Sequence, residues 1–257
     1  MIGRFFSKPA VSKPGRRRPA YALPSGTRVY AIGDVHGRAD LLARLHALIR
    51  RDAAASPSER NVLIHLGDYV DRGLQSREVL EMLAGEAMPG FDRVDLIGNH
   101  DAWMLGFLDD PAMAPAWLAN GGLETLLSYG VGRAADTLPD ERHARMSRDL
   151  AAALPPAHLG FLRRLRRTHR EGDYLFVHAG IRPGVALDDQ EPNDLLWIRE
   201  PFLDDDRDHG LVVVHGHTIA ERPEVFDNRI GIDTGAFATG RLTCLVLEGA
   251  DHRFLQT

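Results

Sequence analysis

The sequence of 257 residues has very little cysteine and lysine and no long hydrophobic run. Its one cysteine, Cys244, lies in the apolar stretch LTCLVL, where we expect a buried strand thiol, so a disulfide within the chain is excluded. No apolar stretch approaches the roughly 20 residues that a membrane-spanning helix needs. The formal net charge of -5 gives no general attraction to nucleic acid or to anionic membranes. We therefore expect a cytoplasmic protein that binds neither.

The first twenty residues combine basic residues with three prolines, in the sequence MIGRFFSKPAVSKPGRRRPA. No apolar core of signal-peptide length follows them. A segment of this composition cannot bury enough apolar surface to offset the entropy of folding. We predict a disordered basic tail over residues 1–20, with a weak anionic contact site as the alternative, and a single domain over residues 21–257.

From Thr27 onward, short apolar runs alternate with longer amphipathic stretches. The pattern predicts strands at 29–32, 62–66 and 94–97, and helices at 39–51, 76–84 and 102–108. Strands that alternate with helices form parallel sheets with right-handed crossovers. The predicted class is α/β.

The stretch from 111 to 170 differs in character, because its leucines and alanines recur at helical spacing and no convincing strand is present. We predict a helical insertion within the domain. Further strands are expected at 174–177, 211–214, 225–226, 230–232 and 242–247, with no long helix after the insertion.

Five of the predicted strands end directly in a polar cluster. The clusters are GDVHG at 33–37, GDYVDRG at 67–73, GNHD at 98–101, VHAG at 177–180 and VHGHT at 214–218. One such cluster alone would be a turn with a packed or exposed histidine, but five in the same position require another explanation. Because ligands collect at the carboxyl ends of parallel strands, we expect these groups to converge on one rim. Carboxylate, imidazole and amide groups together suit a divalent ion such as Mn, Fe or Zn.

The motifs GDVHG, GDYVDRG and GNHD, followed by HAG and GHT, resemble those of the calcineurin-like metallophosphoesterases. Within that superfamily they resemble the PPP-type serine/threonine protein phosphatases and their bacterial relatives. The resemblance covers about residues 29–236. It implies a four-layer sandwich, in which helices flank two mixed β-sheets and a two-metal centre lies between the strand ends.

The resemblance implies two divalent metal ions, with Mn expected first and Fe, Zn, Ni or Co as alternatives. A carboxylate that bridges two ions helps to hold them about 3.5–4 Å apart, and a water between them becomes the hydroxide that attacks phosphorus in line. Asp68 is the implied bridge. The implied ligands are Asp34, His36 and Asp68 for the first ion, and Asp68, Asn99, His178 and His217 for the second.

The resemblance also implies residues that act on the substrate. His100 matches the histidine that protonates the leaving oxygen, and Asp71 matches the carboxylate that orients it. Arg72, Arg199 and Asn99 are the implied phosphate-binding residues. Arg199, in LLWIR, is the weaker match, and an ordinary surface arginine is its alternative.

For two more residues near the motifs, the sequence leaves the role open or indicates a structural one. His215 could be a donor behind the ligands, a substrate contact or a strand-end residue, and we leave it out of the ligand set. Asp233, in IDTGA, is expected to fix a turn near the site rather than to bind metal.

Three substrate assignments compete: phosphoserine or phosphothreonine in proteins, dinucleoside polyphosphates or other nucleotides, and a phosphate that is bound without turnover. Asp71 favours a protein phosphatase, because the bacterial symmetrical dinucleoside tetraphosphatases resemble GDLVARG at this segment. VHAGI, in contrast, is shared with the bacterial dinucleotide enzymes, and GNHD replaces the GNHE of eukaryotic phosphatases. A binder without activity is disfavoured, since every inferred ligand and the acid with its partner are present.

Specificity is expected to lie in the insertion. The segment WLANGGLE at 117–124 is predicted to cap the metal site, and two helices that pack around a glycine break are the alternative. An aromatic clamp for a base would come from Trp103, Trp117 or Tyr129, although large apolar residues at helical spacing more often belong to the core.

Overall fold

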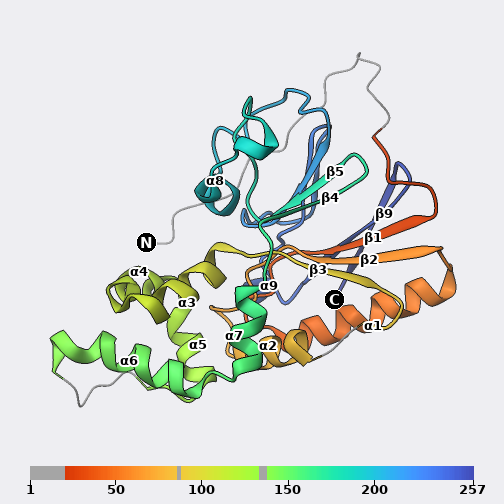
Figure 1. The fold of residues 1–257 in the computed structure, drawn as a ribbon. Coiled ribbons are helices and arrows are strands. Elements are labelled where there is room, and N and C mark those ends of the chain that lie inside the picture. Colours follow the sequence, from red (N-terminus) through yellow and green to blue (C-terminus); the bar gives the residue numbers. More distant parts are fainter. Residues whose placement is uncertain (1–20, 86–87, 133–137) are drawn as a thin grey trace.

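The computed structural model describes residues 21–85, 88–132 and 138–257, which form two five-stranded sheets flanked by helices (Figure 1). The predicted basic tail at 1–20 lies outside these ranges. The first sheet has the order β10-β9-β1-β2-β3, in which β1, β2 and β3 are parallel and β9 and β10 are antiparallel. Its strands are β1 (Thr27–Ile32), β2 (Arg60–His65), β3 (Asp92–Asp95), β9 (Thr243–Glu248) and β10 (Asp251–Gln256).

The second sheet has the order β4-β5-β6-β8-β7, with β5, β6 and β8 parallel and an antiparallel strand at each edge. Both sheets are therefore mixed, as the fold prediction requires. Its strands are β4 (Thr168–Glu171), β5 (Tyr174–Val177), β6 (Val212–His215), β7 (Glu224–Val225) and β8 (Arg229–Gly231).

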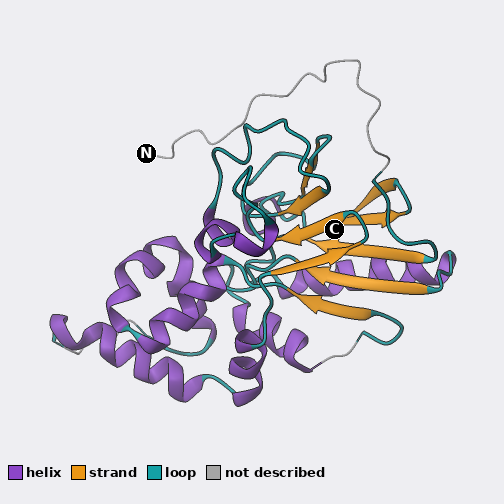
Figure 2. Cartoon of the chain, turned by 45° about the horizontal axis from the view of Figure 1, so that its top comes forward, coloured by secondary structure: helices purple, strands orange, loops and turns teal. Residues whose placement is uncertain are grey.

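Most helices cover the first sheet or extend beyond the strand ends, and the short helix Pro192–Trp197 lies against the second sheet. The yellow and green helices of Figure 1 lie to one side of the strands, and Figure 2 shows the same separation. The α-helices are α1 (Ala39–Ala55), α2 (Ser76–Gly85), α3 (Asn99–Asp109), α4 (Ala114–Trp117), α5 (Leu123–Ser128), α6 (Pro139–Ala153), α7 (Pro156–Arg163), α8 (Pro192–Trp197) and α9 (Ala236–Thr239). Short 3-10 turns cover Pro111–Met113 and Leu187–Asp189, and a π-helical turn covers Leu118–Gly122.

Alternation along β1 explains the layers, because successive strand side chains point to opposite faces. Tyr30 and Ile32 pack under the helices, whereas Val29 and Ala31 belong to the apolar layer between the two sheets. A third buried cluster, which includes Leu195 of α8, covers the outer face of the second sheet. Three apolar interfaces thus separate four layers, and the predicted four-layer α/β sandwich is confirmed.

Strand register brings the polar clusters to one edge. Ile32 pairs with His65, and His65 pairs with Asp95, so the segments that follow β1, β2 and β3 emerge side by side. In the second sheet Phe176 pairs with Val214 and His215 pairs with Gly231, which aligns the ends of β5, β6 and β8. This parallel alignment positions the candidate site.

The prediction for residues 111–170 was wrong at its end, because β4 (Thr168–Glu171) is a strand. Its four residues pair antiparallel with β5 at the sheet edge, and none of them is buried. The described residues before it are helical or irregular, apart from an isolated β-bridge between Arg166 and Leu96. Strand β10 was also missed, while Cys244 is a buried strand thiol in β9 as expected. Among the described residues, none of the helices has the length and apolar composition needed to cross a bilayer.

Candidate metal centre

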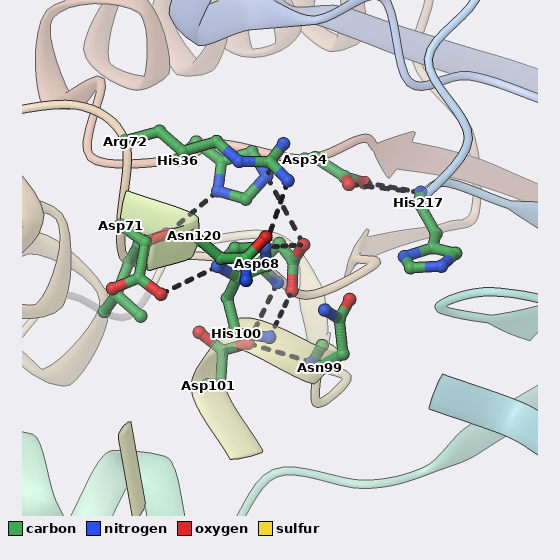
Figure 3. A network of polar contacts seen from close by, with 12 residues as sticks. Asp34, His36, Asp68, Asp71, Arg72, Asn99, His100, Asp101, Asn120 and His217 are labelled. Carbon is green, nitrogen blue, oxygen red and sulfur yellow. Dashed lines mark hydrogen bonds and ion pairs between the residues drawn. The ribbon is translucent and has the colours of Figure 1, made fainter. Parts of the chain in front are cut away.

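Two groups of potential metal ligands meet at Asp68. One group contains His36, Asp68 and His100, the other contains Asp68, His178 and His217, and within each group the ligand atoms lie within 4.8 Å of one another. Asp68 Oδ2 is 3.3 Å from His36 Nε2, and Asp68 Oδ1 is 3.5 Å from His178 Nε2. Its two carboxylate oxygens therefore face the two halves of the site, and the sequence-predicted bridge lies at the centre of the labelled residues in Figure 3.

Two of the histidines are oriented by main-chain oxygens. His36 Nδ1 is 2.9 Å from the Val70 carbonyl oxygen, and His178 Nδ1 is 3.0 Å from that of Leu66. A carbonyl oxygen can only accept, so each Nδ1 carries the proton and each Nε2 keeps its lone pair. Burial lowers the pKa of both imidazoles. Neutral imidazole with a free Nε2 is the form that binds a metal.

The second half of the site contains electron-rich atoms that lack donors. His178 Nε2 is 2.8 Å from Asn99 Oδ1, and neither atom holds a proton to share when Nδ1 is the protonated nitrogen. The Nε2 atom of His217 is buried and has no hydrogen-bond partner, and burial, then His178, lowers the pKa of this imidazole to about 2. Buried polar atoms are nearly always paired in folded proteins. A divalent ion among these atoms would satisfy them, so the donor set fits the metal centre that the sequence predicts.

Asp34, the remaining predicted ligand, is buried but belongs to neither group. Its carboxylate accepts hydrogen bonds from the main-chain N–H of His217, at 3.2 and 3.1 Å (Figure 3). Burial raises the pKa of Asp34 well above its ordinary value, and the charges of Asp233 and Asp68 raise it further. The structure thus places Asp34 next to the ligand groups, where it links the first motif to the last.

His100 and Asp71 form a second functional unit beside Asp68. Asp71 Oδ2 is 2.7 Å from His100 Nδ1, and both side chains are buried. Trp117 Nε1 donates to the same oxygen at 2.8 Å, and Thr125 Oγ1 donates to Asp71 Oδ1 at 2.7 Å. The carboxylate is held from three sides, so it fixes the His100 ring with Nε2 directed toward Asp68 and Arg72.

Arg72 lies between the two imidazoles of this half. Its Nη1 donates to His36 Nε2 at 3.0 Å and its Nη2 donates to His100 Nε2 at 3.1 Å. The guanidinium also lies 4.8 Å from the centre of the Phe237 ring, a cation–π contact. The other predicted phosphate-binding arginine, Arg199, is exposed, but its charge is one of the causes, after burial, that lower the pKa of His178 and His217.

The main chain is strained at the site. Among the described residues, the non-glycine residues with positive φ are all members of the predicted motifs, namely His36, Asp68, Asp71, Arg72 and His217, with φ between 45° and 72°. Each such conformation costs about 1–3 kcal/mol and persists only where the surroundings impose it. The strain follows from turning each side chain sharply out of a strand end toward one point.

Two glycines leave room for the carboxylates. A Cβ atom on Gly98 would lie 2.1 Å from Asp68 Oδ1, and one on Gly216 would lie 2.0 Å from Asp34 Oδ1. No side chain fits at these distances, so both positions need glycine for close approach.

Asp101 supports the site in a way that the motif analysis missed. Its carboxylate accepts main-chain N–H groups from Asp68, Tyr69 and Gly98 at 2.9 to 3.0 Å. It therefore joins the turn that carries Asp68 to the start of α3. The signal was present in the sequence, because an acid three residues after a helix N-cap is the spacing of a capping box. Thr125 and Trp117, in contrast, reach Asp71 through packing of the insertion, for which no motif exists.

His215 lies apart from the ligand groups. Its ring is buried and packs edge-on against Phe202, with centroids 5.2 Å apart, and Nδ1 is 3.1 Å from the Gly216 carbonyl oxygen. Burial lowers the pKa of His215 to about 4. These contacts support the choice to leave His215 out of the ligand set.

The insertion contacts the site through WLANGGLE. Gly121 accepts a hydrogen bond from the main-chain N–H of Arg72 at 3.1 Å, and the buried Trp117 binds Asp71. Tyr129 is also buried and binds His158. Trp103 is half-buried, 5.3 Å from the His100 ring. Of the three aromatic residues considered for a base clamp, Trp103 has an exposed part next to the site.

Comparison with known proteins agrees with this geometry. The sequence model for the calcineurin-like phosphoesterases matches residues 27–233. Serine/threonine-protein phosphatase 2 of Escherichia coli is 27% identical over 224 residues, which cover 84% of this chain and 90% of that protein. The symmetrical bis(5'-nucleosyl)-tetraphosphatase of Methylococcus capsulatus is 34% identical over 157 residues, 60% of this chain and 44% of that enzyme. The chain therefore matches less than half the length of this second relative.

Among solved structures, a provisionally assigned diadenosine tetraphosphatase has the same fold. The TM-score is 0.59 at 21% identity, and the alignment covers 92% of this chain and 98% of that one. This similarity supports the two-sheet architecture and does not bear on the substrate.

Proposed function

The chain belongs to the calcineurin-like phosphoesterase family, and on that basis we propose that it hydrolyses phosphate esters at a centre of two divalent metal ions, with phosphoserine and phosphothreonine in proteins as substrates. The proposed ligands are those that the motifs imply: Asp34, His36, Asp68, Asn99, His178 and His217. When bound, two such ions supply Lewis acidity and an activated water for attack on phosphorus. Mn is the proposed metal.

The observation that carries the proposal is the contact between Asp71 and His100. The carboxylate holds the proton on Nδ1 and stabilises the imidazolium, so that Nε2 can deliver a proton to the leaving oxygen. Serine and threonine are poor leaving groups and need that proton. The bacterial protein phosphatase is matched over 90% of its length, which also supports this substrate class.

The remaining residues of the site would bind the transferred phosphate. Arg72 supplies two N–H groups in one plane, which suits two phosphate oxygens. Asn99 and the exposed Arg199 would approach the same group from the other half of the site. Arg72 donates to His36 and His100, so binding of phosphate by this guanidinium would require it to exchange these partners.

Dinucleoside polyphosphate hydrolysis is the second candidate. Trp103 lies beside His100, and its ring is also 4.5 Å from that of Trp197, which gives a half-buried aromatic surface on the leaving-group side. A nucleobase could stack there. The 34% identity to a symmetrical tetraphosphatase supports this candidate, although over a shorter part of the chain.

A side-by-side comparison of turnover tests the proposal. The full chain with Mn would be given a phosphothreonine peptide, diadenosine tetraphosphate and a mononucleotide at equal concentration. We expect the peptide to have the highest kcat/KM. A large preference for diadenosine tetraphosphate would establish the second candidate instead. If Mn binds normally and even a small aryl phosphate is not hydrolysed, the enzyme proposal fails.

Location and other partners stay predictions from the sequence. A cytoplasmic location, and the absence of nucleic-acid and membrane partners, follow from composition and charge alone.

A further inference from the structure

Three buried side-chain atoms without a hydrogen-bond partner lie in the segments that follow β6 and β8. They are His217 Nε2, Thr218 Oγ1 and Asp233 Oδ2. The proposed metal centre accounts for His217. The proposed metal centre gives no role to Asp233, whose side chain is only 2% exposed. A buried carboxylate oxygen without a donor requires a cation, a proton or a water nearby.

The turn role expected for Asp233 uses only half of its carboxylate. Asp233 Oδ1 accepts the main-chain N–H of Gly235 at 2.8 Å, and its main-chain oxygen accepts that of Ala220 at 3.0 Å. These bonds hold the segment after β8 in place. The other oxygen, Oδ2, takes no part in the turn and remains available.

The charge around Asp233 points to a cation. The segment of Asp233 packs against that of Asp34, because a Cβ atom on Gly33 would lie 3.6 Å from the main-chain nitrogen of Asp233. After burial itself, the charges of Asp233 and Asp68 raise the pKa of Asp34. Asp34 accepts the main-chain N–H of His217, and its carboxylate lies within hydrogen-bond reach of that of Asp233. Three buried carboxyl groups therefore lie close together, and Arg72, the cation that acts on both Asp34 and Asp233, also binds His36 and His100.

We propose that Asp233 is a positioning residue of the first metal: its carboxylate borders that of Asp34 and adds a third carboxylate to that half of the centre. This inference rests on the proposed metal centre. Partners behind the ligands typically change metal affinity by about 10- to 100-fold.

Asp233→Asn separates the charge from the turn. The amide oxygen of asparagine can still accept the Gly235 N–H, so the turn is retained and the negative charge is lost. Mn binding to metal-free protein would be measured by titration calorimetry and by the electron paramagnetic resonance signal of free Mn. We expect one of the two ions to bind about 10- to 100-fold more weakly.

The melting temperature of the metal-free protein is the second measurement, and Asp233→Asn should not lower it. Removal of one of two mutually repelling buried carboxylates should leave this temperature unchanged or raise it. A residue that serves only the turn would give the reverse, a lower melting temperature with unchanged Mn binding, and that result would overturn the inference.

Thr234→Val is the matched control. Thr234 Oγ1 donates to the Arg241 carbonyl oxygen and contacts Thr243 Oγ1, so this change disturbs the same turn without altering charge. Mn affinity should stay at the wild-type value. An equal loss of affinity in both variants would assign the effect to the turn and contradict the proposal. Because Mn binding is measured without substrate, a failure here is distinct from a failure to hydrolyse phosphate esters.

Discussion

The Nδ1 atom of His100 lies 2.7 Å from Oδ2 of Asp71, in a contact that is buried on all sides. The two residues come from different strand ends, one after β2 and the other after β3, and the insertion adds Trp117 and Thr125 to hold the carboxylate. An imidazole fixed in this way has one defined tautomer and one defined direction for its proton.

His100→Asn should lower kcat by about a hundredfold or more, the usual effect of losing a general acid. Metal content, measured by mass spectrometry of the purified protein, should stay at the wild-type value. The loss should be larger for a phosphothreonine peptide than for nitrophenyl phosphate, because nitrophenolate leaves without protonation. Loss of metal in parallel with activity would show that His100 is a ligand or a structural residue.

Trp117→Phe removes one donor from Asp71 while keeping the aromatic packing. We expect kcat to fall roughly tenfold, equivalent to about 1.5 kcal/mol for a hydrogen bond to a charged group. Mn binding should not change. With the phosphothreonine peptide as substrate, Trp103→Phe is the control, since Trp103 contacts the His100 ring but makes no hydrogen bond to Asp71. An unchanged kcat with a lowered melting temperature would mean that Trp117 only packs.

Asp68→Asn should remove the second ion and weaken the first, because one neutral oxygen replaces a charged bridge between the two ligand groups. The measurement is the number of Mn ions that stay bound per chain after gel filtration. Exposed Asp251→Asn in β10 controls for the loss of one negative charge. Full occupancy of both sites in Asp68→Asn would contradict the bridging role.

Acid should destabilise the fold through His46, a buried residue of α1. Burial, then the charge of His65, lowers the pKa of His46 to about 3 from an ordinary 6.5. The unfolded chain therefore binds a proton at His46 below about pH 6.5, whereas the folded chain does not until about pH 3. The free energy of unfolding should fall as the pH drops through this window.

His46→Gln should make that fall less steep, because glutamine does not titrate. Urea unfolding midpoints at intervals between pH 7 and pH 4 provide the measurement, on protein freed of metal so that metal release does not contribute. Exposed His252→Gln should keep the wild-type slope. An identical slope in His46→Gln would assign the acid sensitivity to other groups.

The strand-end clusters could be predicted from the sequence because each follows a strongly apolar run. The parallel order of β1, β2 and β3 then brings Asp34, Asp68 and Asn99 to one edge without any further information. The same reasoning missed β10, whose sequence DHRFLQ has no clear alternation and whose residues are mostly exposed. Pairing with β9 defines that strand, and a single-strand pattern does not contain the pairing.

The parts of the site that could not be predicted depend on tertiary packing. Thr125 is 54 positions from Asp71 and reaches it only because α5 packs beside the turn that follows β2. The sequence IDTGA predicts a turn at Asp233, and the bond from the Gly235 N–H to Asp233 Oδ1 forms that turn. The burial of its second oxygen and the proximity of Asp34 depend on the tertiary fold, so the sequence alone does not contain them.

The close approach of Asp68 to Gly98, and of Asp34 to Gly216, has a consequence for genetics. In a saturation mutagenesis screen, alanine at either glycine should score as badly as loss of a proposed ligand, although neither glycine has a side chain with which to bind anything. A tolerance map of this protein would then outline the centre by positions where a single added methyl group is forbidden. Such a map would locate the site even if every polar residue were withheld from the screen.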